Sequence, residues 1–400
     1  MDLKSGYPYS LIKNGLVAGY PALGKNTKAD VVVLGAGISG ALVAWHLVQK
    51  GVDCMVLDAR SVGLGSTCAS SSLLLYEIDI PLHRLIEMSG LHNATRAYQL
   101  SHRSVNSLVS LANKIGFTDI QKKESIYYAA KARDKILLGK EFTARKKIGI
   151  NVRLLDAKQL MKETGIQAPA AILSSVAAQT DAYLLTHALL SDCSKKGVPV
   201  YDRTPVVKID HNKQGIDLTT ETGFKIKAKK VVYATGYESV NYIDDPIVKL
   251  KSTWAVVSET YPLHQQFWKK ERLIWNTADP YLYIRTTPDH RILVGGRDEN
   301  FYSPSRRDKM TDKKTGLLVK DFKKLFPTQD FKPEFSWTGT FGYTRDGLPY
   351  IGEYKKLKNS YFALGFGGNG ITFSLIAAEM IRDMVTGKKN PDSGLFSFDR

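Results

Sequence analysis

The run DVVVLGAGISGALVAWHLVQKGVDCMVLD, residues 30–58, limits the possible folds more than any other stretch of this chain. Four apolar residues at 31–34 indicate a buried strand, and the pattern from about 38 to 50 is typical of a buried helix. Glycines separate the two, and a second apolar run ends at Asp58. Strand, turn, helix and strand in this order predict a βαβ unit.

The spacing Gly35-x-Gly37-x-x-Gly40 indicates a dinucleotide-binding turn. In such a turn the first glycine permits the bend, the second lets the backbone approach a pyrophosphate, and the third allows close packing of helix on strand. Asp58 lies 23 residues after Gly35, where a carboxylate accepts hydrogen bonds from the adenosine ribose. A carboxylate there disfavours NADP, so NAD and FAD remain open. The alternative is a glycine turn that binds nothing.

The charge of the chain is strongly positive, with 56 Lys and Arg against 39 Asp and Glu and a formal net charge of +17. The lysines lie in scattered pairs such as Lys122-Lys123 and Lys229-Lys230, and no basic block is interleaved with aromatic residues. We therefore predict solvated surface and no nucleic-acid partner. Association with a membrane surface stays open, although no segment supports it.

Length and cysteine use bound the class of protein. With 400 residues and 43% hydrophobic content, the chain can bury a large core in two or three domains. Its three cysteines show neither a CxxC pair nor a Cys/His metal spacing, which predicts a reducing compartment and no metal site. The N-terminus lacks the features of a signal peptide, so we expect a cytoplasmic protein. Glycines in the apolar run at 31–48 argue against a membrane span.

The rest of the chain divides into segments of different character. Residues 81–147 have a helical, basic pattern, which predicts an inserted helical segment. From Thr180 a helix is followed by alternating strands and by the buried strand KKVVYATGY. Residues 246–337 carry aromatic and β-branched residues in short runs, typical of an antiparallel sheet. A strand at 361–364 then leads through the loop GFGGNG into a final helix.

Several segments follow the first βαβ unit in an order that resembles one flavoprotein family. They are GSTCAS and the apolar stretch after it, QTDAYLLTHALL, residues 204–207, VVYATGY, WTGTFGYTRDGLPYIGE at 337–353 and GFGGNGIT at 365–372. Together they make the chain similar to the FAD-dependent oxidoreductases of the D-amino-acid oxidase superfamily, which includes glycine oxidase, sarcosine oxidase and γ-glutamylputrescine oxidase. The resemblance covers nearly the whole chain.

The resemblance implies a fold of mixed class, α/β and α+β. A Rossmann-type FAD-binding domain, similar to that of glutathione reductase, would be built from residues 1–80, 178–245 and 338–400. A substrate domain with an antiparallel β-sheet would comprise residues 81–177 and 246–337. The isoalloxazine ring of FAD would lie between the two domains.

The resemblance also implies a reaction. In such enzymes a hydride passes from the carbon that bears nitrogen to flavin N5, and water hydrolyses the resulting imine. The expected substrate is a small amine or amino acid, and O2 or another acceptor takes the electrons. A flavin hydroxylase, another FAD dehydrogenase and a non-catalytic FAD-binding protein are the alternatives.

FAD is expected to be bound non-covalently, because Gly339 stands where sarcosine oxidase has its covalent cysteine, and Cys68 is expected to be a packing residue. Backbone amides from 368 to 372 at the start of the last helix, Gly370 above all, would stabilise negative charge at the N1/O2 edge of the flavin. The residues expected to hold FAD are Gly35, Ala36, Gly37, Ile38, Ser39, Gly40, Asp58, Ala59, Arg60, Gly65, Ser66, Thr67, Cys68, Ser70, Val206, Ala234, Thr235, Gly236, Gly342, Gly367, Gly368, Asn369, Gly370, Ile371 and Thr372.

The substrate side departs from the family pattern at one position. Many amino-acid oxidases of the superfamily carry an arginine that pairs with the substrate carboxylate, and this chain has Phe341 there. Arg285 or Arg297 would have to replace it. The alternative for each is an arginine on the sheet surface held by a salt bridge.

A second group of candidates follows the apolar stretch at 73–75. Tyr76 and Glu77, together with Asp79, would form a cluster able to bind a cationic amine, or would only form a turn. Tyr283 is expected to line the substrate pocket, with ordinary sheet packing as its alternative.

Overall fold

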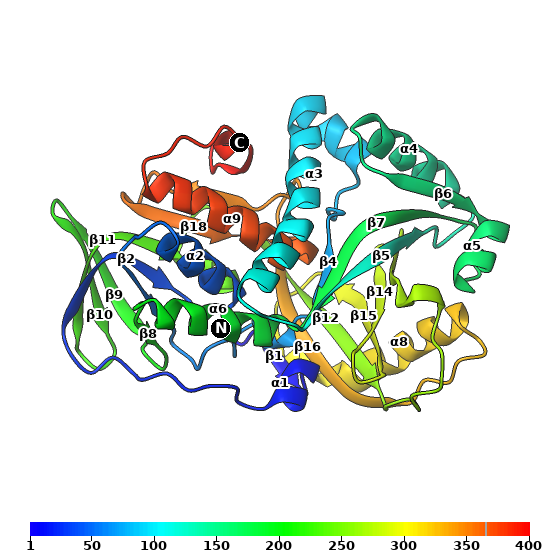
Figure 1. The fold of residues 1–400 in the computed structure, drawn as a ribbon, viewed down its shortest axis with the longest axis horizontal. Coiled ribbons are helices and arrows are strands. Elements are labelled where there is room, and N and C mark those ends of the chain that lie inside the picture. Colours follow the sequence, from blue (N-terminus) through cyan, green and yellow to red (C-terminus); the bar gives the residue numbers. More distant parts are fainter. Residues whose placement is uncertain (365) are drawn as a thin grey trace.

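In the computed structural model, which describes residues 1–364 and 366–400, the chain forms one sheet of eight strands and one of ten. Figure 1 shows them as two lobes, the smaller sheet on the left and the larger on the right. Helices cover the outside of both lobes, and the long helix α3 (Leu82–Lys114) stands between them.

The smaller sheet has a parallel centre. Its order is β17-β18-β11-β2-β3-β8, and β9 and β10 extend β11 as an antiparallel hairpin. The strands are β2 (Thr27–Leu34), β3 (Cys54–Leu57), β8 (Val200–Tyr201), β9 (Val206–Asn212), β10 (Gly215–Thr220), β11 (Lys225–Tyr233), β17 (Tyr350–Glu353) and β18 (Ser360–Leu364).

Three helices bury one face of this sheet: α2 (Ile38–Val48), α6 (Ala182–Lys195) and α9 (Gly370–Val385). Every residue of α2 from Ile38 to Leu47 is buried, because α9 and α6 both pack against it. A helix that is apolar all round needs such neighbours on every side. The predicted βαβ unit is confirmed, with the helix about two residues shorter than expected.

The larger sheet is antiparallel except for one pair, β5 with β13. Its order is β1-β16-β12-β15-β14-β13-β5-β7-β4, with β6 paired to β7. The strands are β1 (Lys4–Gly6), β4 (Leu73–Leu75), β5 (Ile120–Tyr128), β6 (Val152–Asp156), β7 (Ala170–Thr180), β12 (Lys249–Ser258), β13 (Leu273–Asn276), β14 (Leu282–Thr286), β15 (Ile292–Glu299) and β16 (Pro333–Tyr343).

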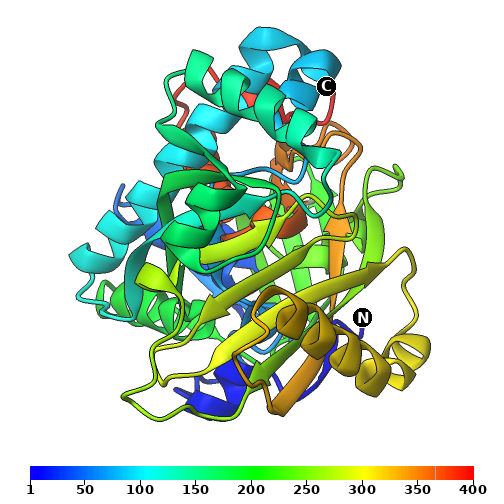
Figure 2. The ribbon, with the colours of Figure 1, turned by 90° about the vertical axis from the view of Figure 1, so that its right-hand side faces the viewer.

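The two faces of the larger sheet have different neighbours. Helix α8 (Thr311–Leu325) lies across one face, where Leu318 and Phe322 pack on Val256 and Val294 (Figure 2). The opposite face turns toward the smaller sheet. Short helices complete the lobe: α1 (Tyr9–Asn14), α4 (Asp134–Lys147), α5 (Ala157–Thr164) and α7 (Pro304–Lys309).

One sequence prediction is wrong in part. Residues 81–147 do contain α3 and α4, but β5 lies between them, where a helical segment was expected. The last four residues of β5 are buried, and the strand bonds to β7 on one side and β13 on the other. Pairing with strands distant in sequence decides the conformation here.

The domain boundaries inferred from the resemblance stay a prediction. β1 and β4, as well as the part of β16 after residue 337, lie in segments expected to belong to the FAD-binding domain. All three pair within the larger sheet. The two lobes are therefore interleaved along the chain.

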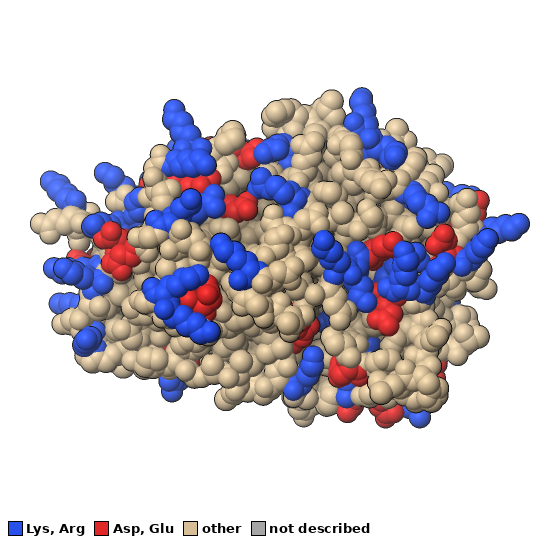
Figure 3. Space-filling model, in the orientation of Figure 1, with Lys and Arg blue, Asp and Glu red and all other residues tan. Residues whose placement is uncertain are grey.

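Lysine and arginine side chains are spread over both lobes on the face seen in Figure 3, with carboxylates among many of them. This distribution matches the scattered lysine pairs of the sequence. Among the described residues, no helix is both long enough and apolar enough to span a membrane.

Candidate functional site

A cavity of about 440 Å³ lies between the two sheets. The smaller sheet contributes the glycine turn after β2 and the ends of β3 and β11 to its lining. The larger sheet contributes aromatic side chains of β13 and β14, and the start of α9 adds a glycine-rich segment. Residues more than 300 positions apart in sequence therefore share one cavity.

The glycine turn has the geometry that its spacing predicts. Gly35 has φ of +103°, and a Cβ there would lie 2.4 Å from the carbonyl oxygen of Ala234. At Gly40 a Cβ would lie 1.8 Å from the carbonyl oxygen of Gly35, so only glycine lets α2 pack this closely. At Gly37 a Cβ would meet Thr67 Oγ1 at 2.9 Å, and the backbone there lines the cavity.

Asp58 lines the cavity at the end of β3. Its Oδ2 accepts the amide of Ala36 at 2.7 Å, and its Oδ1 accepts the amide of Arg60 at 2.8 Å. Burial raises the pKa of Asp58, and the two amides oppose that rise. Each carboxylate oxygen keeps a further lone pair, as a hydrogen bond from a ribose hydroxyl requires.

Most of the expected cofactor residues line the cavity. Those that do are Gly35, Gly37, Ile38, Ser39, Asp58, Ala59, Arg60, Gly65, Ser66, Thr67, Ser70, Val206, Ala234, Thr235, Gly236, Gly367, Gly368, Asn369, Gly370 and Ile371. Ala36, Gly40, Cys68, Gly342 and Thr372 do not. Two of these five hold residues beside the cavity. The Ala36 amide donates to Asp58, and Thr372 Oγ1 donates to the carbonyl oxygen of Leu75 at 3.1 Å.

The Cys68 thiol is buried and points to the carbonyl oxygen of Gly65 at 3.5 Å. Burial raises its pKa to about 11, which keeps the thiol protonated. A packing role fits this position, and the non-covalent binding of FAD stays a prediction.

The glycine-rich loop before α9 is held against the segment that follows β4. The amide of Gly368 donates to Asp79 Oδ2 at 2.9 Å, and Asn369 Nδ2 donates to the carbonyl oxygens of Leu75 and Glu77 at 3.0 and 2.9 Å. Gly367 has φ of +57°, a conformation that favours glycine. Gly365, the first residue of GFGGNGIT, lies outside the described residues.

At Gly367 and Gly368 of this loop, neighbouring atoms leave no room for a side chain. A Cβ at Gly367 would lie 2.6 Å from Asp79 Oδ2, and one at Gly368 would lie 2.4 Å from the Tyr281 hydroxyl. The loop thus exposes backbone to the cavity, next to the first amides of α9, which have no partner within the helix. Together with the glycine turn and Asp58, these features fit an FAD molecule, adenosine at one end and flavin at the other.

Aromatic side chains form the wall that the larger sheet contributes. Tyr283, as predicted, lines the cavity, together with Tyr281, Trp275 and Phe341, and Tyr237 lines it from the short helix after β11 of the smaller sheet. Tyr283 lies across Gly295 of the neighbouring strand, where a Cβ would be 2.1 Å from its hydroxyl oxygen. Trp275 stacks on Tyr127 with ring centroids 3.8 Å apart.

Asp298 also lines this wall, and the sequence interpretation missed it. The pairing of β12 with β15 passes from Trp254–Gly296 to Ser252–Glu299, so β15 carries one extra residue there. This β-bulge reverses the alternation of side chains. Counting on from Gly295, which faces Tyr283, strict alternation would aim residue 297 at the cavity.

Because of the bulge, Arg297 turns away and Asp298 takes its place in the cavity lining. Arg297 makes two bonds to the carboxylate of Asp321, at 2.6 and 2.5 Å. Its φ of 60° marks the left-handed conformation at which the strand is bent. The Arg297 side chain therefore lies outside the cavity lining, and its contact with substrate stays a prediction.

Arg285, the other predicted replacement for the family arginine, does not line the cavity. It is buried, and it donates to the carbonyl oxygens of Ser71 at 2.6 Å and Thr286 at 3.1 Å. Phe341 does line the cavity at the position of the missing arginine. Among the described lining residues, Arg60 is the one basic side chain, and it pairs with Glu238 at 2.6 Å.

Tyr76 and Glu77 belong to a buried ion cluster instead of an open amine site. Arg145 donates to the Tyr76 hydroxyl at 3.2 Å and to Glu77 Oε1 at 3.3 Å, and it bonds Glu141 at 2.8 Å. Ser125 adds a bond to Glu77 at 2.9 Å. Tyr76 lies outside the cavity lining. Glu77 lines the cavity, with Oε1 paired to Arg145 and Oε2 without a hydrogen-bond partner among the described residues. Burial raises the pKa of Glu77, and Arg145 opposes the rise.

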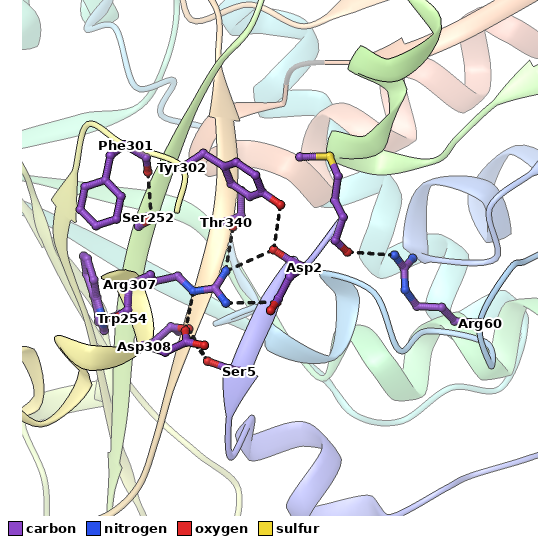
Figure 4. Close-up of polar contacts among 12 residues, drawn as sticks. Asp2, Ser5, Arg60, Ser252, Trp254, Phe301, Tyr302, Arg307, Asp308 and Thr340 are labelled. Carbon is purple, nitrogen blue, oxygen red and sulfur yellow. Dashed lines mark hydrogen bonds and ion pairs between the residues drawn. The ribbon is translucent and has the colours of Figure 1, made fainter. Parts of the chain in front are cut away.

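The N-terminal segment lies beside the cavity, and Figure 4 shows the polar contacts that hold it. Leu3 lines the cavity, and β1 pairs with β16 at the edge of the larger sheet. The buried Arg307 side chain fixes this segment, with bonds to Asp2 Oδ1 at 3.1 Å, Thr340 Oγ1 at 3.0 Å and Asp308 Oδ1 at 2.9 Å. On the other side, Arg60 donates to the carbonyl oxygen of Met1.

A family model, curated relatives and solved structures match this chain over most of its length. A family model described as FAD dependent oxidoreductase matches residues 30–384. The chain is 23% identical to a probable oxidoreductase OrdL of Haemophilus influenzae, over 92% of this chain and 85% of the relative. It is 24% identical to a D-amino acid dehydrogenase of Neisseria meningitidis, over 90% of this chain and 96% of the relative. The crystal structure of a glycine oxidase from Geobacillus kaustophilus superposes with a TM-score of 0.78 at 21% identity, covering 93% of this chain and 99% of that one.

Proposed function

Because this chain belongs to the family of FAD-dependent oxidoreductases, we propose that it oxidises a carbon–nitrogen bond of a small amine or amino acid. The cavity carries the proposal, because it joins a nucleotide-binding turn to an aromatic pocket beside the glycine-rich loop. The names of the relatives, among them a D-amino acid dehydrogenase, support this substrate class. FAD, when bound, would supply the electron acceptor for a hydride from the carbon that bears the nitrogen.

The substrate needs only water as a further reactant. As the C–H bond breaks with its electron pair, the nitrogen lone pair forms the C=N bond of an imine. Water then adds to that carbon, and the nitrogen leaves as ammonia or an amine. An ammonium substrate must lose a proton before it reacts, since its lone pair is otherwise occupied.

The residues of the chain would contribute binding and orientation. The glycine turn, Asp58 and the amides at the start of α9 would hold FAD at its two ends. Tyr281, Tyr283 and Trp275 would press the substrate toward the loop and keep bulk water out. Gly370, predicted to stabilise charge through its amide, begins α9 at the cavity.

The test is the spectrum of the purified protein and its reduction. We expect a yellow protein with a flavin spectrum that bleaches without oxygen when an amine or amino acid from a mixed panel is added, and without NADPH. A colourless protein that takes up no added FAD would contradict the cofactor assignment. Bleaching by NADPH alone would contradict amine oxidation and favour a hydroxylase.

A further inference from the structure

The wall formed by β14 and β15 contains a half-buried acid, Asp298, whose carboxylate accepts a hydrogen bond from the side chain of Thr253. Oδ1 of Asp298 is buried and has no hydrogen-bond partner among the described residues. A buried carboxylate oxygen without a partner is costly, so native structures rarely retain one without a use. The bulge that aims Asp298 at the cavity includes a left-handed non-glycine residue, Arg297, and strain of this kind is concentrated at functional sites.

Aromatic rings surround the same part of the cavity. The centroids of Tyr281 and Tyr283 lie 6.1 Å apart, and Trp275 meets Tyr281 edge-on, with centroids 6.3 Å apart. Burial raises the pKa of Tyr281 well above its usual value, and the charges of Asp79 and Asp298 add to that rise. Neutral rings beside a carboxylate make a favourable environment for an ammonium group.

The charged groups that face Asp298 leave its Oδ1 without a partner among the described residues. Lys314 of α8 is buried and donates to Arg297 O and Glu299 Oε1, both at 2.7 Å. Lys251 of β12 lies over the ring of Tyr343, 4.1 Å from its centroid. Neither lysine lines the cavity or bonds to Asp298 among the described contacts. Asp79, the third charge nearby, is another carboxylate and adds to the negative potential.

We propose that the substrate of this site is a cationic amine without a carboxylate on the reacting carbon, its ammonium group held by Asp298 and the rings of Tyr281 and Tyr283. This inference rests on the proposed oxidation of a C–N bond and specifies its substrate class. An amino-acid substrate would place its carboxylate beside two acids, with Phe341 in place of the family's arginine. Like charges that close repel each other, whereas an ammonium is attracted to both.

The direct test uses three ligands that share a tert-butyl group. None of them can be oxidised to an imine, because the central carbon of that group has no hydrogen. These are tert-butylammonium, tert-butanol and pivalate, which are cationic, neutral and anionic. Each is titrated into the FAD-loaded protein at pH 8, and binding is read from the change in the flavin spectrum. We expect tert-butylammonium to bind at least about tenfold more tightly than tert-butanol, and pivalate to bind least.

Two variants assign the effect to the acid. Asp298→Asn should remove the preference for tert-butylammonium over tert-butanol while FAD is retained. Asp312→Asn, the same change at an exposed position of α8, should leave the preference intact. A preference that survives in Asp298→Asn would overturn the assignment to this residue.

The remaining outcomes separate the inference from the function on which it rests. Equal binding of the three ligands, tightest binding of pivalate, or no binding of any of them overturns the cation site. If the flavin is nevertheless bleached by amino acids, the proposed function stands and only the substrate class is wrong. If no amine or amino acid bleaches it, the proposed function itself fails.

Discussion

The two ends of the cavity contain acids with opposite surroundings. At the nucleotide end, Asp58 is satisfied by two backbone amides from its own βαβ unit. At the substrate end, Asp298 comes from a bulged strand, and one of its oxygens has no described partner. The first acid is part of a preformed cradle. The second has a buried oxygen without a partner, and in the proposed site this oxygen would receive the ammonium group of the substrate.

The construction of the two ends also differs. Residues 30–60 contribute the glycine turn and Asp58 to the nucleotide end, and local backbone rules determine this part of it. The substrate end is lined by side chains from β13, β14, β15 and the segment after β4. These elements are distant in sequence, so the site forms only when they pack together. Substitutions at the nucleotide end should therefore abolish FAD binding, and substitutions at the substrate end should alter which substrates bind.

The largest effect is expected at Gly40. In Gly40→Val the new Cβ would overlap the carbonyl oxygen of Gly35, so α2 cannot pack on the turn, and FAD retention should be lost. Gly139→Val, in helix α4 where a Cβ meets nothing within 4 Å, is the matched control. The measurement is the ratio of bound flavin to protein after gel filtration.

If Gly40→Val does not fold, Gly37→Ala tests the same end more gently. Its Cβ meets only the hydroxyl of Thr67, which would lose its hydrogen bond from the Ile38 amide on moving away, so the fold should remain and FAD affinity should fall. Unchanged affinity in Gly37→Ala would remove the support for the glycine turn as the cofactor site.

The next largest effect concerns Glu77 and tests whether its ion cluster with Arg145 stabilises the fold. Arg145→Met leaves Glu77 and Glu141 buried without their partner, which should lower the free energy of unfolding by about 3–5 kcal/mol. Lys147→Met, an exposed change on the same helix, should alter it by less than about 0.5 kcal/mol. Denaturant unfolding gives both values. A small loss in Arg145→Met, comparable to the control, would refute the cluster as a structural element.

Asp298→Asn should stabilise the protein while it weakens cation binding. Burial raises the pKa of Asp298 to about 6, above the ordinary value near 4 that it has when unfolded. The folded state therefore loses stability as pH rises through this interval, and above pH 6 the loss amounts to as much as about 3 kcal/mol. The variant should gain this amount at pH 8 and nothing at pH 4, as seen by denaturant unfolding of the FAD-free protein. A variant destabilised at pH 8 would contradict the picture of an unsatisfied acid.

Much of the nucleotide end could be predicted from the sequence, because backbone contacts require glycine at two positions of the turn, Gly35 against Ala234 and Gly40 against Gly35. The substrate end could not. Residue 298 enters the cavity through an extra residue in β15, and alternation alone predicts 297. The chemistry of Tyr76 and Glu77 favours an amine site, but the Arg145 that pairs with them lies about 70 positions away. No pattern in the residues around Tyr76 and Glu77 indicates a partner so distant in sequence.

The smallest effect is the pH dependence of cation binding. With the pKa of Asp298 at about 6, affinity for tert-butylammonium should be constant above pH 7 and about tenfold lower at pH 5, where the carboxyl group is mostly protonated. The pKa of the ligand lies far above this range, so its charge does not change. Titrations of the flavin spectrum at several pH values measure the affinity. In Asp298→Asn the dependence should disappear, and its persistence would assign it to another group such as Asp79.

The most direct measurement of the central claim compares two compounds that differ only by a carboxylate on the reacting carbon. The FAD-loaded protein is mixed without oxygen with n-butylamine and, separately, with each enantiomer of 2-aminopentanoate, and the rate of flavin bleaching is followed. The account predicts that the amine reduces the flavin faster than either amino acid, and that Asp298→Asn slows the amine reaction. Faster reduction by an amino acid, unchanged in Asp298→Asn, would contradict it.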